Sequence, residues 1–245
     1  MQRHATAAKH TLLVLGVFVA AVVPAVAQTS TVIEREVREE LRRDRDLRRL
    51  EVTVVGGEVT LRGALKTFWS KSEAIRRSLT VDGVERVVSE MEIPPAESDQ
   101  KLANEVGKAV QRYPYYTVFD YLDGRINAGV ITLLGKVTAE RDKARELFER
   151  VAKIPGVQDV QNQIETMTPS SADDNLRRNI ARVVFGSSHF QQFSSRSNPP
   201  FHIVVERSVV TLLGYVQSEI ERREMEQLAR QTTGVLRVVN LLQTP

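Results

Sequence analysis

One short phrase occurs three times and constrains the fold more than any other feature of the sequence. Its copies occupy Thr60–Gly63, Thr132–Gly135 and Thr211–Gly214, and read Thr-Leu-Arg-Gly once and Thr-Leu-Leu-Gly twice. A polar, helix-like stretch follows each copy and ends in a Gly-Val pair. The glycine of that pair lies 20, 21 and 20 residues after the glycine of the phrase. Repetition at a fixed spacing predicts tandem copies of one module.

The module boundaries follow from two linker-like segments. Residues 94–98 contain paired prolines, and residues 168–172 are Thr-Pro-Ser-Ser-Ala, a composition typical of short, stiff connections. We therefore expect modules at 32–93, 99–167 and 173–245. The third is longer because of an insertion-like stretch, 186–200, rich in serine, asparagine and proline.

Each module has the pattern helix, strand, strand, helix, strand. Apolar residues recur every four positions in the first helix, as in Ile33, Val37 and Leu41, and short β-branched runs follow. This order predicts an α+β fold: a three-stranded mixed sheet, built from an antiparallel hairpin and a returning third strand, packed on two helices. Six glycines define the repeats: Gly63, Gly83, Gly135, Gly156, Gly214 and Gly234.

The glycines of each repeat are expected to have two different roles. Gly83 and its counterparts stand where a helix must stop, and glycine tolerates the left-handed backbone needed there. Gly63 and its counterparts end a strand, where we expect a bend or a close approach by the following helix.

The repeated motifs resemble the BON domain, a family named for bacterial osmotically inducible periplasmic proteins and nodulation proteins. The resemblance rests on the Val-Thr-Leu-x-Gly strand and on the ending Gly-Val-x-x-Val-x-Asn, complete at 156–162 and 234–240. The first repeat departs from it at Ser89, where the asparagine would stand. The resemblance implies a noncatalytic envelope protein, associated with phospholipid surfaces and with osmotic or envelope stress.

The first 27 residues have the character of an export signal. A basic start precedes an apolar run from Leu12 to Val23, and Ala25-Val26-Ala27 offers the small residues of a cleavage site. The alternative is a retained membrane anchor, but the run is shorter than a spanning helix requires. We expect cleavage after Ala27 and a periplasmic or exported protein. The sequence has no cysteine, which excludes disulfides and a lipid-anchor cysteine.

Charge and residue content argue against several function classes. The formal net charge is only +3, without a clustered basic footprint, so nucleic acid is not an expected partner. After the export signal the only histidines are His189 and His202, which we interpret as a solvated loop residue and a strand-edge residue. With no cysteine and no dense acidic cluster, we expect neither a metal site, a cofactor nor an enzyme.

Two aromatic groups are candidate contacts with a membrane or a partner. The first is Arg112, Tyr113, Tyr115 and Tyr116, since tyrosines beside an arginine suit a lipid headgroup zone. The alternative is that some of these tyrosines close the core of their own module. The second group is Phe190, Phe193 and Arg196 in the inserted loop. This loop could dock on a membrane or partner, or fold back over its own module.

Apolar residues also occupy the second face of two predicted sheets. A sheet with helices on one side should have a polar outer face if that face meets only water. In the second and third repeats the outward positions are apolar: Val130, Leu134, Val209 and Leu213. We expect these residues to pack repeats two and three together, with repeat one more independent. The alternative is contact with lipid or another protein.

These observations favour a binding protein of the envelope. The expected partners are phospholipid surfaces or envelope proteins, and the expected role is support of envelope integrity under stress. The alternative is a periplasmic protein-interaction scaffold or chaperone, with a binder of a small solute or ion as a third possibility.

Overall fold

The computed structural model describes residues 23–196 and 198–245, with side chains from Thr29 onward. Most of the expected export signal, residues 1–22, lies outside the described residues. Its remaining residues, 23–27, form the beginning of the first helix.

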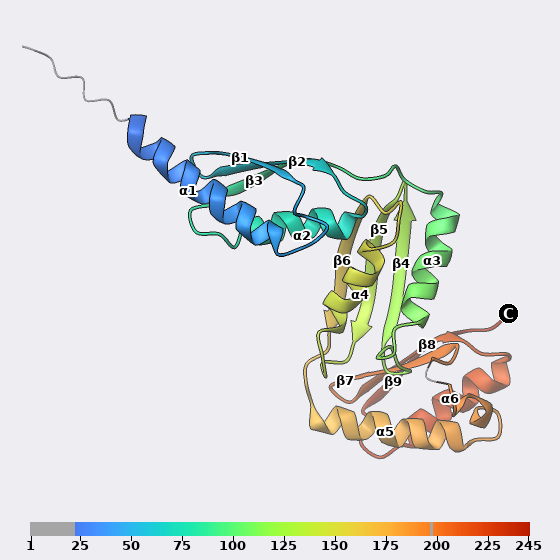
Figure 1. Cartoon of the computed structure of the whole chain (residues 1–245). Coiled ribbons are helices and arrows are strands. Elements are labelled where there is room, and N and C mark those ends of the chain that lie inside the picture. The colour runs from blue at the N-terminus through green and yellow to red at the C-terminus, as the bar shows by residue number, and fades with distance from the viewer. Residues whose placement is uncertain (1–22, 197) are drawn as a thin grey trace, which may run out of the picture.

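Three modules follow one another along the chain, each built from two helices and a three-stranded sheet (Figure 1). The first comprises α1 (Val23–Arg42), β1 (Glu51–Val55), β2 (Glu58–Ala64), α2 (Phe68–Ser78) and β3 (Arg86–Glu92). The second comprises α3 (Asp99–Gln111), β4 (Tyr121–Asn127), β5 (Val130–Val137), α4 (Lys143–Ala152) and β6 (Asp159–Thr166). The third comprises α5 (Ser171–Gly186), the 3₁₀ turn η1 (Gln191–Phe193), β7 (Phe201–Glu206), β8 (Val209–Tyr215), α6 (Glu219–Gln231) and β9 (Arg237–Gln243).

The sheets have the same topology in all three modules. The first two strands pair antiparallel across a tight turn, and the third pairs parallel with the second. The second strand, which contains the repeated phrase, is therefore central in each sheet. The predicted α+β fold, with mixed three-stranded sheets on two helices, is confirmed.

Each core forms where the helical and strand periodicities meet. In the first module, Ile33, Val37 and Leu41 are buried along one face of α1, because residues four apart share a helix face. Val59 and Leu61 of β2 alternate toward the same interior and are fully buried.

The repeat-defining glycines have positive φ angles, but both groups differ from the prediction in one respect. Gly83 has a φ of 83°, yet α2 already ends at Ser78 with Leu79 as its C-cap, so Gly83 shapes the turn that leads to β3 and does not stop the helix. Gly135 has a φ of 132°, and a Cβ there would lie 2.0 Å from the carbonyl oxygen of Tyr121. The close approach therefore comes from the preceding strand of the hairpin and not from the following helix.

The asparagine of the repeated ending joins the last strand to the second helix. Asn162 donates to the carbonyl of Ala144 at 3.0 Å, and its Oδ1 accepts from the amide of Ile164 at 3.3 Å. Asn240 makes equivalent bonds in the third module. Ser89, its counterpart in the first, has a buried hydroxyl without a hydrogen-bond partner among the described residues.

Repeat one also packs against repeat two, a contact that the sequence did not predict. Phe68 and Trp69, at the start of α2, make edge-to-face contacts with Phe148 of α4, with ring centroids 6.5 and 6.0 Å apart. The ammonium of Lys153 lies 5.4 Å from the Trp69 ring. The contact was missed because these aromatic residues stand at a helix start and outside the apolar periodicity.

Repeats two and three meet end to face (Figure 1). One end of the second sheet abuts the third sheet on the side opposite α5. The amide of Ile203 on β7 donates to the carbonyl of Val118 at 2.7 Å, and Lys136 pairs with Glu206 at 2.6 Å. His202 of β7 lies against Tyr121, with ring centroids 5.7 Å apart.

This junction agrees only in part with the expected packing of two apolar sheet faces, because the third sheet presents its outer face and the second presents one end. Val130, Leu134, Val209 and Leu213 are all partly exposed, and other residues join the two repeats. The second sheet contributes the loop before β4 and one end instead of its face, which corrects that part of the expectation.

Candidate binding surfaces

The described residues contain no group of acidic and histidine side chains that could hold a metal ion, and no helix that could cross a bilayer. His189 pairs with Glu224 at 2.5 Å and remains half exposed. His202 is buried, and burial lowers its pKa below the ordinary histidine value. His202 therefore favours its neutral form at the junction of repeats two and three.

The phenylalanines of the inserted loop belong to the core of repeat three. Phe190 and Phe193 are buried, and both rings contact Phe201, at centroid distances of 5.6 and 5.4 Å. Arg196 is exposed, with its guanidinium 5.4 Å from the Phe193 ring. The loop thus folds back over its own module, which corrects the expectation that these two phenylalanines form a contact surface.

Two of the candidate tyrosines are also buried. The hydroxyl of Tyr113 donates to Glu146 at 2.6 Å. Burial is the larger cause that raises the pKa of Tyr113, and the hydrogen bond to the carboxylate of Glu146 is the second. The hydroxyl of Tyr116 accepts from the amide of Leu122 at 3.2 Å and lies 3.5 Å from Nε2 of His202. Tyr113 and Tyr116 therefore hold the module together and are not surface contacts.

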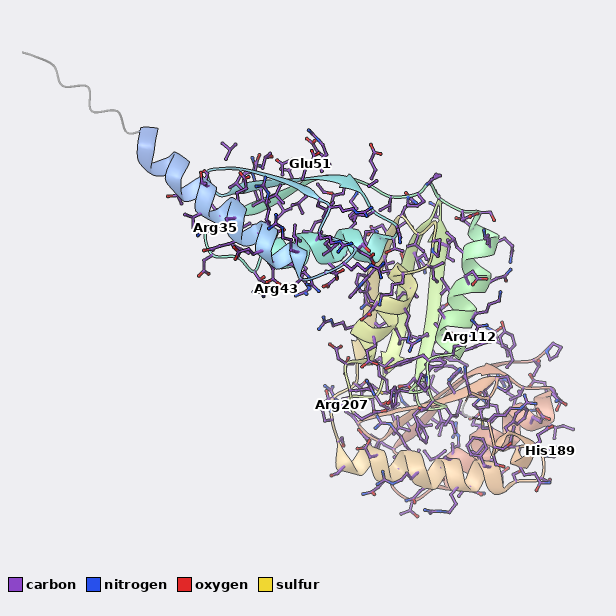
Figure 2. All side chains as sticks on the ribbon, in the orientation of Figure 1. Arg35, Arg43, Glu51, Arg112, His189 and Arg207 are labelled. Carbon is purple, nitrogen blue, oxygen red and sulfur yellow. The ribbon has the colours of Figure 1, made fainter. Side chains whose placement is uncertain are left out.

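Tyr115 differs, since 46% of it is exposed. The guanidinium of Arg141 lies 3.7 Å from its ring centroid, and that of Arg150 lies 4.8 Å from the ring of Tyr113. The rings of Tyr113 and Tyr115 are 5.7 Å apart. We call these four residues, together with Glu146, the Tyr115 cluster. Arg112, exposed at the end of α3 nearest repeat three (Figure 2), precedes it in the sequence.

Electrostatic contacts fix the Tyr115 cluster in place. Glu146 accepts from the hydroxyl of Tyr113 and from Arg141 at 2.7 Å, and these bonds lower the pKa of Glu146 below its usual value. A single carboxylate thus anchors one arginine and one tyrosine. Arg150 and Arg112 remain exposed without an ion pair among the described residues. The cluster is therefore an aromatic surface with a positive surplus.

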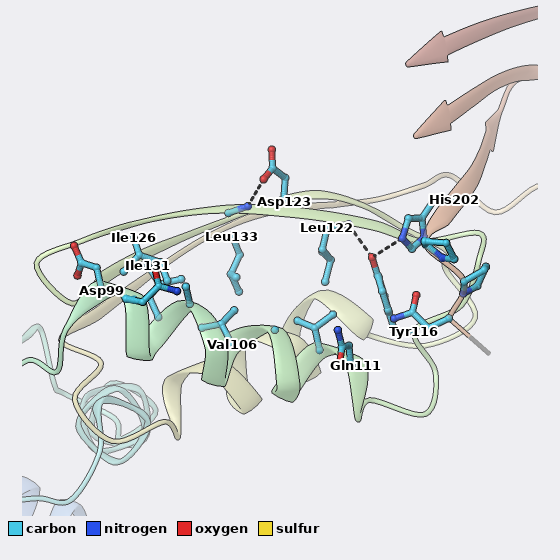
Figure 3. A pocket seen from close by; sticks show the side chains of 18 of the residues that line it. Asp99, Val106, Gln111, Tyr116, Leu122, Asp123, Ile126, Ile131, Leu133 and His202 are labelled. Atoms are coloured by element: carbon cyan, nitrogen blue, oxygen red, sulfur yellow. Dashed lines mark hydrogen bonds between the residues drawn. The ribbon is translucent and has the colours of Figure 1, made fainter. Parts of the chain in front are cut away.

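A groove of about 1030 Å³ runs between α3 and the hairpin of β4 and β5 (Figure 3). Its floor is apolar, formed by Val106, Val110, Leu122, Ile126, Ile131 and Leu133. Asp99 stands at one end, while Tyr116 and His202 stand at the other. No motif in the sequence predicts this groove.

The groove arises from a residue difference between the repeats. The β-strand registers place Val52 opposite Leu61, Gly124 opposite Leu133, and Ile203 opposite Leu212. Gly124 therefore takes the position that a buried β-branched residue fills in the other two modules. Alignment of the three repeats with one another would have revealed this glycine.

A buried polar network holds the loop that precedes β4. Lys143 and Asp120 are fully buried, and the ammonium lies 2.8 Å from one carboxylate oxygen. Asp120 also accepts from the amide and hydroxyl of Thr117 and from those of Thr138, at 2.8–3.0 Å. This network fixes residues 117–120, which carry Val118 to the edge of β7.

The family assignment agrees with the repeated architecture. The model of the BON domain matches residues 29–95, 98–167 and 172–245. This chain belongs to the BON domain family. The three matches span most of the sequence, and each covers one helix–strand–strand–helix–strand unit apart from the first residues of α1 and α5.

Among solved structures, the chain is similar to two of CdsD, a structural protein of the type III secretion system of Chlamydia trachomatis. One, of the C-terminal domain, is 13% identical with a TM-score of 0.26, and covers 86% of this chain and 96% of that chain. The other is 14% identical with a TM-score of 0.25, and covers 86% and 92%. The comparison with curated proteins gives no match.

Proposed function

We propose that this protein is a noncatalytic, exported envelope protein that contacts phospholipid surfaces and supports envelope integrity under osmotic or envelope stress. Membership of the BON family supports an envelope-associated binding role. The export signal expected from residues 1–27 supports a periplasmic location.

The Tyr115 cluster carries the phospholipid part of the proposal. A tyrosine ring can enter the headgroup zone while its hydroxyl remains hydrated, and an arginine attracts anionic phosphates. Tyr115 is half exposed, and Arg141, Arg150 and Arg112 provide the positive charge around it. Because the positive residues are few, the attraction should be moderate and sensitive to salt.

Co-sedimentation with liposomes tests this function. We expect binding to vesicles that contain anionic phospholipid, and weaker binding when the salt concentration is raised. The substitution Tyr115→Ser should weaken binding several-fold. The matched control is Tyr215→Ser, which removes a tyrosine that is 60% exposed on repeat three. Absence of binding to both anionic and neutral vesicles would remove the proposal. Equal loss with the two variants would move the contact away from the Tyr115 cluster.

A second candidate is a protein-interaction scaffold. One specific observation favours it: β4 is an outer strand of its sheet and borders the groove. Exposed strand edges are a common means of binding a polypeptide.

A further inference from the structure

The outer edge of β4 has main-chain groups that pair with no neighbouring strand. The amides of Leu122 and Gly124 donate to the side chains of Tyr116 and Asp123, at 3.2 and 2.7 Å, and not to β5. Because N–H and C=O groups of alternate residues point to opposite edges of a strand, the carbonyls of Leu122, Gly124 and Ile126 also face away from β5.

In the other two modules, arginines cover the corresponding edge. Arg38 of α1 donates to the carbonyl of Val52 at 3.0 Å, and Arg177 of α5 donates to the carbonyl of Val205. The edge of β7 is closed further by Val118, whose carbonyl accepts from the amide of Ile203. The first helix and a neighbouring segment thus protect these edges from foreign strands.

Repeat two lacks both arginines. In each module an amide of the first hairpin turn donates to a side chain of the first helix: Ser30, Asp99 or Asp173. These three residues therefore occupy equivalent positions, and the first helices can be aligned on them. Counted from these residues, Arg177 corresponds to Ala103, and Arg38 corresponds to Gly107. No hydrogen bond to the carbonyl of Gly124 or Ile126 occurs among the described residues. Among the three modules, the edge of β4 therefore has small residues, Ala103 and Gly107, where the other two modules have a covering arginine.

The groove lies directly beside this edge. Ala103 and Gly107 line it on the helix side, and Asp123, Gly124 and Ile126 line it on the strand side (Figure 3). The 13 residues of α3 form a helix about 20 Å long, so the groove beside it has room for about six residues of an extended chain. The volume of the groove, about 1030 Å³, is at the upper end of the range for ordinary ligand sites.

We propose that this groove binds an extended polypeptide segment, which adds to the edge of β4 as a fourth strand of the second sheet. Apolar side chains at alternate positions of the segment enter the groove, and the segment's amides donate to the open carbonyls of Gly124 and Ile126. An acyl chain could fill the apolar floor, but it has no N–H groups for these carbonyls. The pairing of Val118 with β7 is the same mode of contact within the molecule. This inference rests on the scaffold candidate and is independent of phospholipid contact.

A defined peptide in solution tests the inference without a membrane. The probe is the blocked, fluorescent peptide Lys-Val-Thr-Val-Thr-Val-Thr-Lys, titrated against the full chain and followed by anisotropy. Two further versions are N-methylated at the valines or at the threonines, so that each lacks the donors of one edge. We expect one version to lose binding at least about tenfold and the other to retain it. Amide exchange at Gly124 should slow when the peptide is bound.

A graft of the missing arginines provides the matching change in the protein. The double substitution Ala103→Arg and Gly107→Arg should cover the edge of β4 as in the other modules. It should weaken peptide binding at least about tenfold. A Cβ at Gly107 meets no atom within 4 Å, so the side chain can be accommodated. The control is Asn104→Arg, which adds one positive charge at an exposed position of α3 outside the groove and is matched in charge to either single variant, Ala103→Arg or Gly107→Arg.

Three results would overturn the inference. The first is unchanged peptide affinity in a double variant whose circular dichroism and unfolding midpoint match the original chain. The second is equal binding of both N-methylated peptides. The third is binding of a fluorescent fatty acid in the groove with no binding of any peptide. Each of these outcomes leaves the liposome result unaffected, so the two proposals can fail separately.

Discussion

The buried pair of Lys143 and Asp120 gives the sharpest prediction about stability, because the two partners are not equivalent. Asp120 accepts four hydrogen bonds from Thr117 and Thr138 in addition to the ammonium of Lys143. Lys143 is held by Asp120, by the hydroxyl of Thr138 at 2.6 Å, and by the partly exposed Glu140 at 2.5 Å. Removal of one partner should therefore cost more than removal of the other.

The substitution Asp120→Ala should be the more damaging. It leaves a buried ammonium without its main counter-charge and four donors without their acceptor, and the loss of one partner of a buried pair costs about 3–5 kcal/mol. Lys143→Met keeps most of the volume and leaves Asp120 with its four donors. We expect it to cost less, about 1–3 kcal/mol, because the buried carboxylate keeps its four hydrogen-bond donors.

Urea unfolding of the full chain measures the difference. Circular dichroism follows all three modules, and the fluorescence of Trp69, the only tryptophan, follows the junction of repeats one and two. Since three modules need not unfold together, both signals should be compared at each urea concentration. If Lys143→Met destabilises the chain as much as Asp120→Ala does, the hydrogen bonds of Asp120 do not carry the network, and the reasoning is refuted.

Three further predictions concern the junction, the repeated asparagine and the glycines. Burial lowers the pKa of His202, so the unfolded chain takes up a proton that the folded chain does not. Stability should thus fall as the pH drops through about 6.5, by up to about 1.4 kcal/mol per pH unit, and His202→Phe should remove this loss in urea titrations. Ser89→Asn should raise the thermal midpoint of repeat one by supplying the hydrogen bonds between the last strand and the second helix that the other repeats have. Asn240→Ser should remove those bonds in repeat three and cost about 1 kcal/mol. Thermal midpoints equal to that of the unsubstituted chain would contradict both predictions. Gly135→Ala should destabilise strongly in chemical denaturation because its Cβ meets a carbonyl, whereas Gly107→Ala should be neutral or stabilising by up to about 1 kcal/mol.

The fold could be predicted from the sequence because its determinants are local and occur three times. The periodicity of Ile33, Val37 and Leu41 indicates a helix face, and a glycine such as Gly83 marks the turn between the second helix and the last strand. These signals act within a few residues, so each repeat reports them independently. Agreement among three copies then compensates for the weakness of each motif.

The junctions between modules could not be predicted in the same way. Trp69 and Val118 make their contacts across repeats, and nothing in their immediate sequence shows which surface they will meet. The phenylalanines of the inserted loop illustrate the same difficulty. Phe190 and Phe193 are equally suited to a core and to an exposed patch, and only the position of Phe201 decides between them.

The groove was missed for a different reason, since its signal is the absence of side chains. Gly124, Gly107 and Ala103 belong to no motif, and the residues around each of them do not indicate a groove. Their meaning appears only when the three repeats are compared position by position. Small residues then stand where the other modules have a buried valine or isoleucine and two arginines.

The small side chains of repeat two leave this edge open, while hydrogen bonds hold the segment that precedes it. The loop held by Asp120 closes β7 through Val118, and the hydroxyl of Tyr116 bonds the first outward amide of β4, that of Leu122. A strand that adds to β4 would therefore meet the segment that joins repeats two and three. If strand binding changes the stability of that junction, linkage requires that loosening the junction change the affinity for the strand by the same free energy.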